Sequence, residues 1–168
     1  MGDPRAPATD VGPMIDRIKA EDAYRKVQEA VTQGARILTG GTLEGTMFTP
    51  TVLVDTNSTM RVNKEEVFAP VISVAPYDDF SEALRIANAG EFGLQVGIFT
   101  QNINRAMQAF ADMDVGGVIV NDIPTFRVDQ MPYGGAKGSG IGREGPRYAI
   151  EEMSELRLMV INRNGGMA

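Results

Sequence analysis

Apolar residues recur every three or four positions between residues 19 and 33, and this spacing predicts an amphipathic helix. We expect its buried face to consist of Ala20, Tyr24, Val27 and Val31. The charged residues of this segment, Lys26 among them, are expected to face solvent. Gly34 follows at the position where glycine ends many helices, so the helix should stop there.

Short apolar segments alternate with further helical patterns along the rest of the chain. Strands are expected at residues 35–39, 49–54, 71–75, 94–99, 117–120 and 156–161. Helices are expected at residues 80–89, 102–113 and 147–153, the first of them capped by Asp79. The segment 117–120 is apolar throughout, which is typical of a strand buried on both faces. The alternation predicts an α/β fold, a mostly parallel sheet flanked by helices.

Length and composition indicate one globular domain without a membrane span. The chain has 168 residues, 43% of them hydrophobic, and a net charge of −6. No apolar run approaches the roughly 18 residues of a transmembrane helix, and the N-terminus lacks the layout of a signal peptide. A pI near 4.7 argues against nucleic acid or an anionic membrane as a partner. We therefore expect a cytoplasmic protein that binds neither.

The chain contains no cysteine and no histidine. This excludes a thiolate nucleophile, an imidazole base, disulfides and the common zinc ligand sets within the chain. We expect no metal site. Any chemistry performed by this chain alone would depend on carboxylates, lysine, tyrosine or hydroxyl side chains.

Residues 131–146 stand out because they hold six glycines together with three charged side chains. A Walker phosphate loop requires Ser or Thr after its lysine, whereas Gly138 follows Lys137 here. Residues 140–145 match G-x-G-x-x-G in letters, but no apolar strand leads directly into them and no acidic residue follows about 20 positions later. Composition alone therefore favours a close backbone crossing where only glycine fits.

The same loop resembles a family signature. Pro132-Tyr-Gly-Gly-Ala-Lys-Gly-Ser-Gly-Ile-Gly-Arg-Glu144 is similar to P-F/Y-G-G-x-K-x-S-G-x-G-R-E, found near the C-terminus of NAD(P)-dependent aldehyde dehydrogenases. Upstream, Glu66-Val-Phe-Ala-Pro70 resembles the E-I/V-F-G/A-P motif of that family. Further family segments are matched in order at residues 11–16, 50–53, 93–100 and 116–121. The chain is therefore identified as a member of that family, similar to the branch acting on lactaldehyde or phosphonoacetaldehyde.

The resemblance implies one partial catalytic domain over residues 1–168, with the aldehyde dehydrogenase fold. Residues 156–162 would form a terminal strand that contributes to subunit contacts. A complete family member is about three times as long. The segment from Gly2 resembles the stretch directly after the family's catalytic cysteine, so the cysteine, the general-base glutamate, the asparagine oxyanion donor and the Rossmann-type cofactor domain are expected to lie outside the chain.

Two residues are implied in cofactor binding. In the family, the glutamate matching Glu66 accepts hydrogen bonds from the nicotinamide ribose hydroxyls, and the phenylalanine matching Phe68 packs beside the nicotinamide. The sequence alone favours a second interpretation of Phe68, as an aromatic residue of the core. The neighbouring Glu65 is interpreted as part of a solvated turn. The resemblance leaves open whether the cofactor is NAD or NADP, and we expect neither to bind this chain tightly.

The resemblance also implies catalytic and substrate residues. Glu144 matches an acid that relays protons from the active site, although Arg143 and Glu144 could equally be solvated charges. Phe126, Arg127 and Tyr133 match positions that contact the aldehyde, and Lys137 and Ser139 are expected to have positioning roles. Arg127 could hold an anionic group through its planar guanidinium, or it could pair with Asp129 across the loop.

Two functions are compatible with this sequence. The first is a part of an oxidoreductase that converts a small aldehyde to a carboxylic acid with NAD(P), through a cysteine thiohemiacetal whose nucleophile lies outside the chain. The chain by itself is then expected to be inactive. The alternative is a non-catalytic oligomerisation module, because the apolar strand at residues 156–161 is an edge that can pair with another chain. Both interpretations predict a homo-oligomer.

Overall fold

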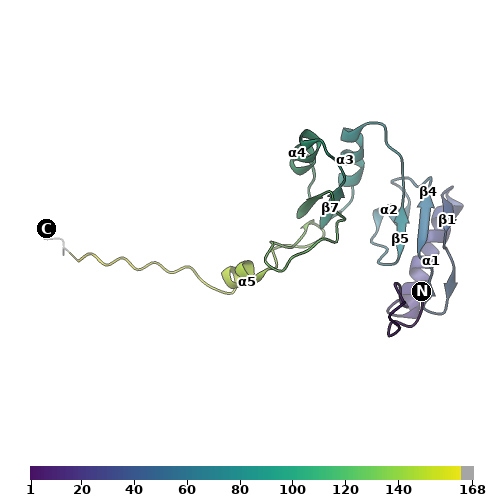
Figure 1. Cartoon of the computed structure of the whole chain (residues 1–168), viewed down its shortest axis with the longest axis horizontal. Helices are drawn as coiled ribbons and strands as arrows, with labels where there is room; N and C mark the ends of the chain where they lie inside the picture. The colour runs from purple at the N-terminus through teal and green to yellow at the C-terminus, as the bar shows by residue number, and fades with distance from the viewer. Residues whose placement is uncertain (164–168) are drawn as a thin grey trace. The chain divides into compact units, whose positions relative to one another are not determined.

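The computed structural model describes residues 1–163 (Figure 1). The chain divides into two compact units, Met1–Gly90 and Glu91–Ala168. The sequence predicts a single domain over residues 1–168, whereas the backbone contacts of this chain cluster in two separate groups. Each unit forms its own small sheets.

The first unit contains three helices and five strands among its described residues. They are α1 (Arg17–Thr32), β1 (Arg36–Thr39), β2 (Leu43–Glu44), β3 (Met47–Phe48), β4 (Thr51–Val54), α2 (Arg61–Lys64), β5 (Val71–Ser73) and α3 (Phe80–Asn88). A three-stranded sheet has the order β1-β4-β5, with β1 antiparallel and β5 parallel to β4. Strands β2 and β3 form a separate antiparallel pair that the sequence pattern did not predict.

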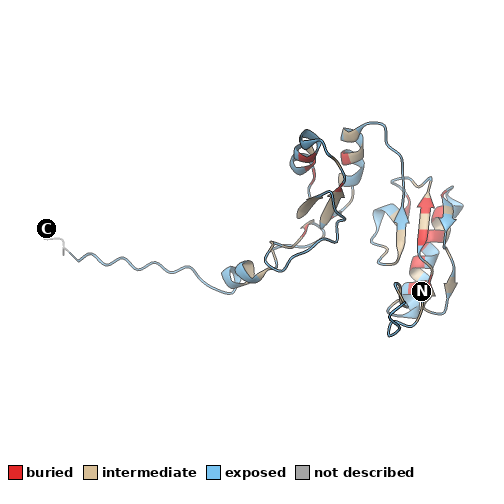
Figure 2. Cartoon of the chain, viewed as in Figure 1, coloured by how far each residue is buried: buried red, intermediate tan, exposed pale blue. Residues whose placement is uncertain are grey.

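The core of this unit lies between α1 and the strands. The side chain of Asp16 accepts a hydrogen bond from the Lys19 backbone N–H at 2.7 Å and caps the first turn of α1. Ala23 and Val27 of the helix pack with Phe48 and Leu53 of the strands, all of them fully buried. Figure 2 colours the buried parts of this unit red. The amphipathic helix expected at residues 19–33 is confirmed.

The buried face of α1 differs from the expected one. Tyr24 and Val31 remain partly exposed, whereas Ala23, Lys26 and Ala30 are buried. Small alanine side chains let the helix approach its neighbours closely, so the face that they line is the one that packs. The expectation that Lys26 faces solvent is therefore wrong.

The second unit contains two helices and four strands among its described residues. They are β6 (Phe92–Gly93), β7 (Gln95–Ile98), α4 (Ile103–Asp112), β8 (Gly117–Val120), β9 (Ala136–Lys137) and α5 (Pro146–Glu152). Strands β7 and β8 are parallel, and β6 pairs with β9 in the antiparallel sense. The apolar strand β8 is only partly buried, because β7 is its one neighbour in the described residues.

The α/β class predicted from the sequence is confirmed. Two strand pairs are parallel, β4 with β5 and β7 with β8. The strands of the described residues nevertheless form four small sheets instead of one continuous sheet. None of the helices in this part of the chain has the length and apolar character that crossing a membrane requires.

Residues 156–161 form no strand in this chain, although one is predicted there. Figure 2 colours this segment as exposed. Leu156 and Leu158 are among the most exposed apolar residues of the described chain. A β-strand is stabilised by hydrogen bonds to a neighbouring strand, and none of the described residues supplies that neighbour. The oligomerisation role of residues 156–162 stays a prediction.

Candidate functional site

The glycine-rich loop is anchored to β6. The backbone N–H of Gly93 donates to the Ser139 hydroxyl at 2.9 Å, and the N–H of Gly138 donates to the carbonyl oxygen of Glu91 at 2.8 Å. A side chain at Gly134 would meet the Gly142 carbonyl oxygen at 2.7 Å, closer than real side chains approach. The loop is thus a close backbone crossing, as its composition predicts, and the Ser139 hydroxyl ties it to β6.

An isolated β-bridge within this loop joins Tyr133 and Glu144. The N–H of Tyr133 donates to the Glu144 carbonyl oxygen at 3.1 Å, and the N–H of Glu144 donates to the Tyr133 carbonyl oxygen at 2.6 Å. Residues directly opposite in such a bridge carry their side chains on the same face. The bridge therefore brings a tyrosine and a carboxylate together from the two ends of the signature.

Arg127 completes this group. Its Nη2 donates to Glu144 Oε2 at 3.0 Å, and its guanidinium carbon lies 4.3 Å from the centre of the Tyr133 ring. A guanidinium over an aromatic face is attracted by the negative face of the ring. Three predicted site residues thus form one cluster, which we call the Arg127 cluster: Arg127, Tyr133 and Glu144.

The cluster bears on two alternatives that the sequence left open, the partner of Arg127 and the surroundings of Glu144. Arg127 forms its ion pair with Glu144, and Asp129 forms none with the described residues. Glu144 is therefore a partner of Arg127 and not simply a solvated charge. Arg143 is also engaged, because its Nη1 donates to the carbonyl oxygens of Gly135 at 3.0 Å and of Gly142 at 2.7 Å.

Phe126 lies in the same loop as Arg127, one residue before it. The side chain of Gln95 on β7 donates to the Pro124 carbonyl oxygen at 2.6 Å and to the Phe126 carbonyl oxygen at 3.2 Å. These bonds tie the loop to the parallel pair β7 and β8. The Phe126 side chain remains 44% exposed, so its ring is accessible to a ligand.

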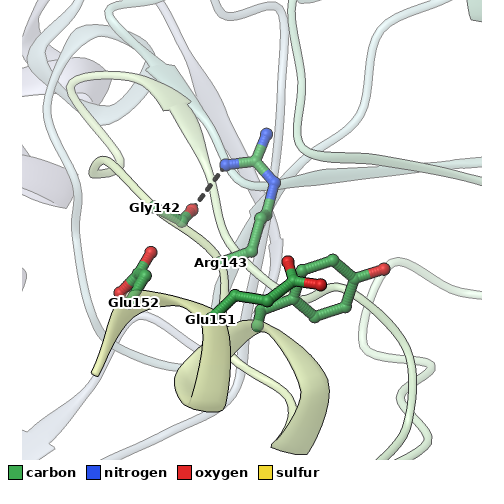
Figure 3. Close-up of a pocket in the computed structure, with 5 residues that line it drawn as sticks. Gly142, Arg143, Glu151 and Glu152 are labelled. Carbon is green, nitrogen blue, oxygen red and sulfur yellow. Dashed lines mark hydrogen bonds between the residues drawn. The ribbon is translucent and has the colours of Figure 1, made fainter. Parts of the chain in front are cut away.

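A pocket of about 370 Å³ lies next to the signature and α5 (Figure 3). Its lining consists of Gly142, Arg143, Tyr148, Glu151 and Glu152. In Figure 3 the Arg143 guanidinium extends from the loop with its hydrogen bond to Gly142, while Glu151 and Glu152 rise from the helix. Glu151 is paired with Arg147 at 2.9 Å. None of the residues predicted to contact aldehyde or cofactor lines this pocket.

Glu66 and Phe68 follow α2 in the first unit. Phe68 is 83% exposed and has a φ of +48°, a left-handed conformation that is uncommon outside glycine. The interpretation of Phe68 as a core aromatic is therefore wrong. The Glu66 side chain is exposed as well, and its carboxylate accepts no hydrogen bond from residues 1–163.

The backbone that carries these two residues is held by Lys26, whose role the sequence pattern did not predict. Lys26 is 6% exposed, and its Nζ donates to the Glu66 carbonyl oxygen at 3.2 Å. The same ammonium lies 3.2 Å from Asp22 Oδ2 and 3.1 Å from Glu65 Oε2. The sequence offers one indication that Lys26 is buried. Lys26 lies three residues after Ala23 and four before Ala30, which places all three on one face of the helix.

Glu65 is exposed in the bend after α2, as the solvated-turn interpretation expects, and it also belongs to this ion-pair network. Arg61 Nε donates to Glu65 Oε1 at 2.8 Å and Arg61 Nη2 to Glu65 Oε2 at 3.0 Å, a bidentate pair. Arg61, and after it Lys26, lower the pKa of Glu65 from 4.5 to about 2. A second carboxylate, that of Glu29, accepts from Arg61 Nη1 at 3.0 Å and ties α2 to α1.

The comparison with known proteins identifies the class. The model of the aldehyde dehydrogenase family matches residues 1–159, so this chain belongs to the aldehyde dehydrogenase family. It is 47% identical over 162 residues to a 3-sulfolactaldehyde dehydrogenase of Priestia aryabhattai, a match that covers 96% of this chain and 34% of that protein. The chain thus spans about a third of the length of the curated relatives it matches.

Solved structures show the same fold. Aldehyde dehydrogenase 21 from Physcomitrella patens, in complex with the reaction product succinate, has a TM-score of 0.91 and 45% identity, over 95% of this chain and 33% of that one. Glyceraldehyde-3-phosphate dehydrogenase from Methanocaldococcus jannaschii, complexed with NADP, has a TM-score of 0.83 and 42% identity, over 88% of this chain and 32% of that one. The fold predicted from the resemblance, part of an aldehyde dehydrogenase catalytic domain, is confirmed.

Proposed function

We propose that this chain supplies the C-terminal part of an NAD(P)-dependent aldehyde dehydrogenase that oxidises a small anionic aldehyde to a carboxylic acid. The reaction would proceed through a thiohemiacetal on a cysteine that this chain does not contain. The observation that carries the proposal is the Arg127 cluster, in which the predicted substrate cation, Tyr133 and the predicted proton-relay carboxylate are in contact with one another.

Arg127 is proposed to bind the anionic group of the substrate. Its guanidinium presents planar N–H donors that match carboxylate, sulfonate or phosphate oxygens. Three similar proteins act on sulfolactaldehyde, bind succinate as product, or act on glyceraldehyde 3-phosphate, and each of these compounds carries an anionic group. The exposed ring of Phe126 and the half-buried ring of Tyr133 would contact the short carbon chain between the anion and the aldehyde.

Glu66 and Phe68 are proposed to hold the nicotinamide end of NAD or NADP. The fit is supported by the Glu66 carboxylate, which is exposed and without a donor among the described residues, so both of its oxygens can accept from ribose hydroxyls. Phe68 offers an exposed aromatic face two residues further on. When bound, the cofactor would accept the hydride of the aldehyde carbon.

Glu144 is proposed to move a proton away from the reacting centre. Its carboxylate is 68% exposed, so it can pass a proton between the site and bulk water. The backbone bridge to Tyr133 fixes the main chain of Glu144, and its side chain is then the part free to move. This role requires the carboxylate to be available for proton transfer.

The chain alone is expected to show no turnover. It has neither cysteine nor histidine, and its serine and threonine hydroxyls have no imidazole to activate them. The purified chain is incubated with NAD or NADP and lactaldehyde, and reduced cofactor is followed by absorbance at about 340 nm against a heat-treated control. Reduction above that control would contradict the proposal that the nucleophile lies outside the chain.

Residual cofactor contact can be tested separately. We expect weak binding of NAD, seen by NMR as shifts of the Glu66 and Phe68 amides, and Glu66→Gln should weaken it. Shifts that are confined to other residues would argue against the proposed cofactor contact. A Glu44→Gln variant, with the same charge change on an exposed β2 residue, serves as the control.

A second candidate function is a non-catalytic oligomerisation module. The observation that favours it is the exposed apolar segment at residues 156–161, which forms no strand within the described chain. The module would self-associate through this segment and would not bind NAD. The NAD titration therefore separates the two candidates, and the cytoplasmic location expected for either one stays a prediction.

A further inference from the structure

We propose that Glu144 is an internal competitor for the anion site at Arg127, so that the anionic group of a bound substrate displaces the Glu144 carboxylate and releases it. The inference rests on the proposed function, in which Arg127 binds that group. It is carried by a separate observation, the ion pair of 3.0 Å that Arg127 already forms with a carboxylate of its own chain. The Glu144 carboxylate and the anionic group of the substrate therefore compete for the Arg127 guanidinium.

The internal carboxylate uses only part of the donor set of Arg127. Nη2 donates to Glu144 Oε2, and the guanidinium donates to no second side-chain or carbonyl oxygen within residues 1–163. A guanidinium has five N–H groups in a planar fork. A sulfonate or carboxylate arriving from solvent can accept two parallel hydrogen bonds, where Glu144 accepts one. The incoming anion can therefore replace the internal one.

The exchange requires little rearrangement. The side chains of Arg127 and Glu144 are 44% and 68% exposed, and ion pairs of that exposure are weak. Tyr133 supports the guanidinium at 4.3 Å from its ring centre, whether or not Glu144 is paired. The two backbone hydrogen bonds between Tyr133 and Glu144 hold the main chain while the carboxylate leaves.

This arrangement links substrate class to catalysis. A neutral aldehyde leaves Arg127 paired with Glu144, and the carboxylate stays occupied. An anionic aldehyde occupies Arg127 and frees the carboxylate that is proposed to relay protons. Glu144 thereby acts as a specificity-determining residue, in addition to its proposed role in proton transfer.

The test is a titration of the 168-residue chain with methanesulfonate, followed by backbone amide NMR, with dimethyl sulfone as the uncharged probe of similar shape. We expect Glu144→Gln to tighten methanesulfonate binding about 2- to 5-fold, because an exposed ion pair of that strength is removed. Arg127→Met should abolish binding. Asp129→Asn makes the same change in net charge two residues from Arg127, and it should alter the affinity by less than about 1.5-fold.

The outcomes separate this inference from the proposed function. Equal tightening by Glu144→Gln and Asp129→Asn would overturn the inference, since it would reflect net charge alone. Unchanged affinity in Glu144→Gln, together with loss of binding in Arg127→Met, would overturn the inference and leave the anion site standing. If Arg127→Met binds methanesulfonate as tightly as the unmodified chain does, the proposed anion site at Arg127 is contradicted. It is also contradicted if neither the unmodified chain nor Glu144→Gln binds methanesulfonate. Glu144→Gln keeps the size of the side chain, and its amide spectrum checks the fold.

Discussion

Lys26 is a buried cation at the centre of a small charge network. Its ammonium contacts Asp22, Glu65 and the Glu66 carbonyl oxygen within about 3.2 Å, so each of its three N–H groups has an acceptor. A buried charge costs free energy unless it is paired in this way. The network also joins α1 to the segment that carries Glu66 and Phe68, so a structural residue and the proposed cofactor contact depend on one another.

Substitution of Lys26 by methionine should destabilise the chain. The change leaves the Glu66 carbonyl oxygen without its donor and removes a partner of Glu65, at a cost of about 1–3 kcal/mol in the free energy of unfolding. Urea denaturation followed by circular dichroism measures the difference. Arg25→Met is the matched control, because Arg25 pairs with Asp22 from an exposed position and should cost less than about 0.5 kcal/mol. Equal losses in both variants would contradict the role given to Lys26.

Glu65 should make the stability of the chain dependent on acid pH. Because its pKa is lowered from 4.5 in the unfolded chain to about 2 in the folded one, the folded state binds fewer protons between these values. The stabilisation is present above about pH 4.5 and is lost as the pH falls toward 2. Glu65→Gln should therefore be less stable than the unmodified chain at neutral pH and should lose less stability on acidification. Parallel pH profiles from urea denaturation would contradict this.

At the scale of elements, the turns that join the short strands depend on glycine at defined positions. Gly40 follows β1 with a φ of +79°, and a side chain there would overlap the carbonyl oxygen of Pro50. Gly45 lies between β2 and β3 with a φ of +60°, and a side chain there would meet nothing within 4 Å. The two positions share the left-handed backbone and differ in the space beside it.

This difference predicts unequal effects of alanine. Gly45→Ala should cost about 1 kcal/mol, since only the left-handed conformation is penalised. Gly40→Ala should cost more than about 2 kcal/mol, because the overlap with Pro50 also has to be relieved. Thermal and urea unfolding of the two variants give the comparison. Equal costs would mean that the approach of Gly40 to β4 does not constrain the turn.

The helices show how far local pattern determines an element. Asp79 accepts from the Glu82 N–H at 2.8 Å, and Asn102 caps α4 in the same way at 2.9 Å. The helix α3 begins where Asp79 predicts, and Asn102, predicted as the first residue of the helix at 102–113, is its cap. The apolar residues Ile103, Met107 and Phe110 of α4 are nevertheless exposed, and Ala106 and Ala109 form its buried side. Local sequence thus determines where the helix begins, and packing determines which side is covered.

At the scale of the whole molecule, the exposed apolar segment at residues 156–161 should drive self-association. Exposed apolar surface of this kind is usually covered by another chain, and an unpaired strand sequence provides hydrogen-bonding groups for it. We expect a dimer or larger assembly by light scattering at high micromolar concentration. Leu158→Asp combined with Val160→Asp should shift the chain toward the monomer.

A control variant tests whether this effect belongs to the segment. Ile150→Asp introduces a charge at an exposed apolar residue of α5, outside the segment, and should leave the assembly unchanged. A stable monomer of the unmodified chain would contradict the prediction. Dissociation caused equally by Ile150→Asp would assign the association to general surface hydrophobicity.

The sequence by itself determined the family, the α/β class and the positions of most helices and strands, because motifs, caps and periodicity are local properties of the chain. It also predicted Arg127, Tyr133 and Glu144 as site residues, but it left the partner of Arg127 open between a ligand and Asp129. The tertiary structure decided that partner, because a bridge between residues 133 and 144 places Glu144 beside Arg127.

Only the tertiary structure could reveal the burial of Lys26 and the exposure of Phe68. Both depend on which segments pack against α1, and that packing joins residues about 40 positions apart in the chain. The segment 156–161 is the opposite case, in which the sequence predicts a strand that the structure does not form. Its sequence has the apolar character of a strand, but a strand forms only where a neighbour supplies the opposite half of each hydrogen bond.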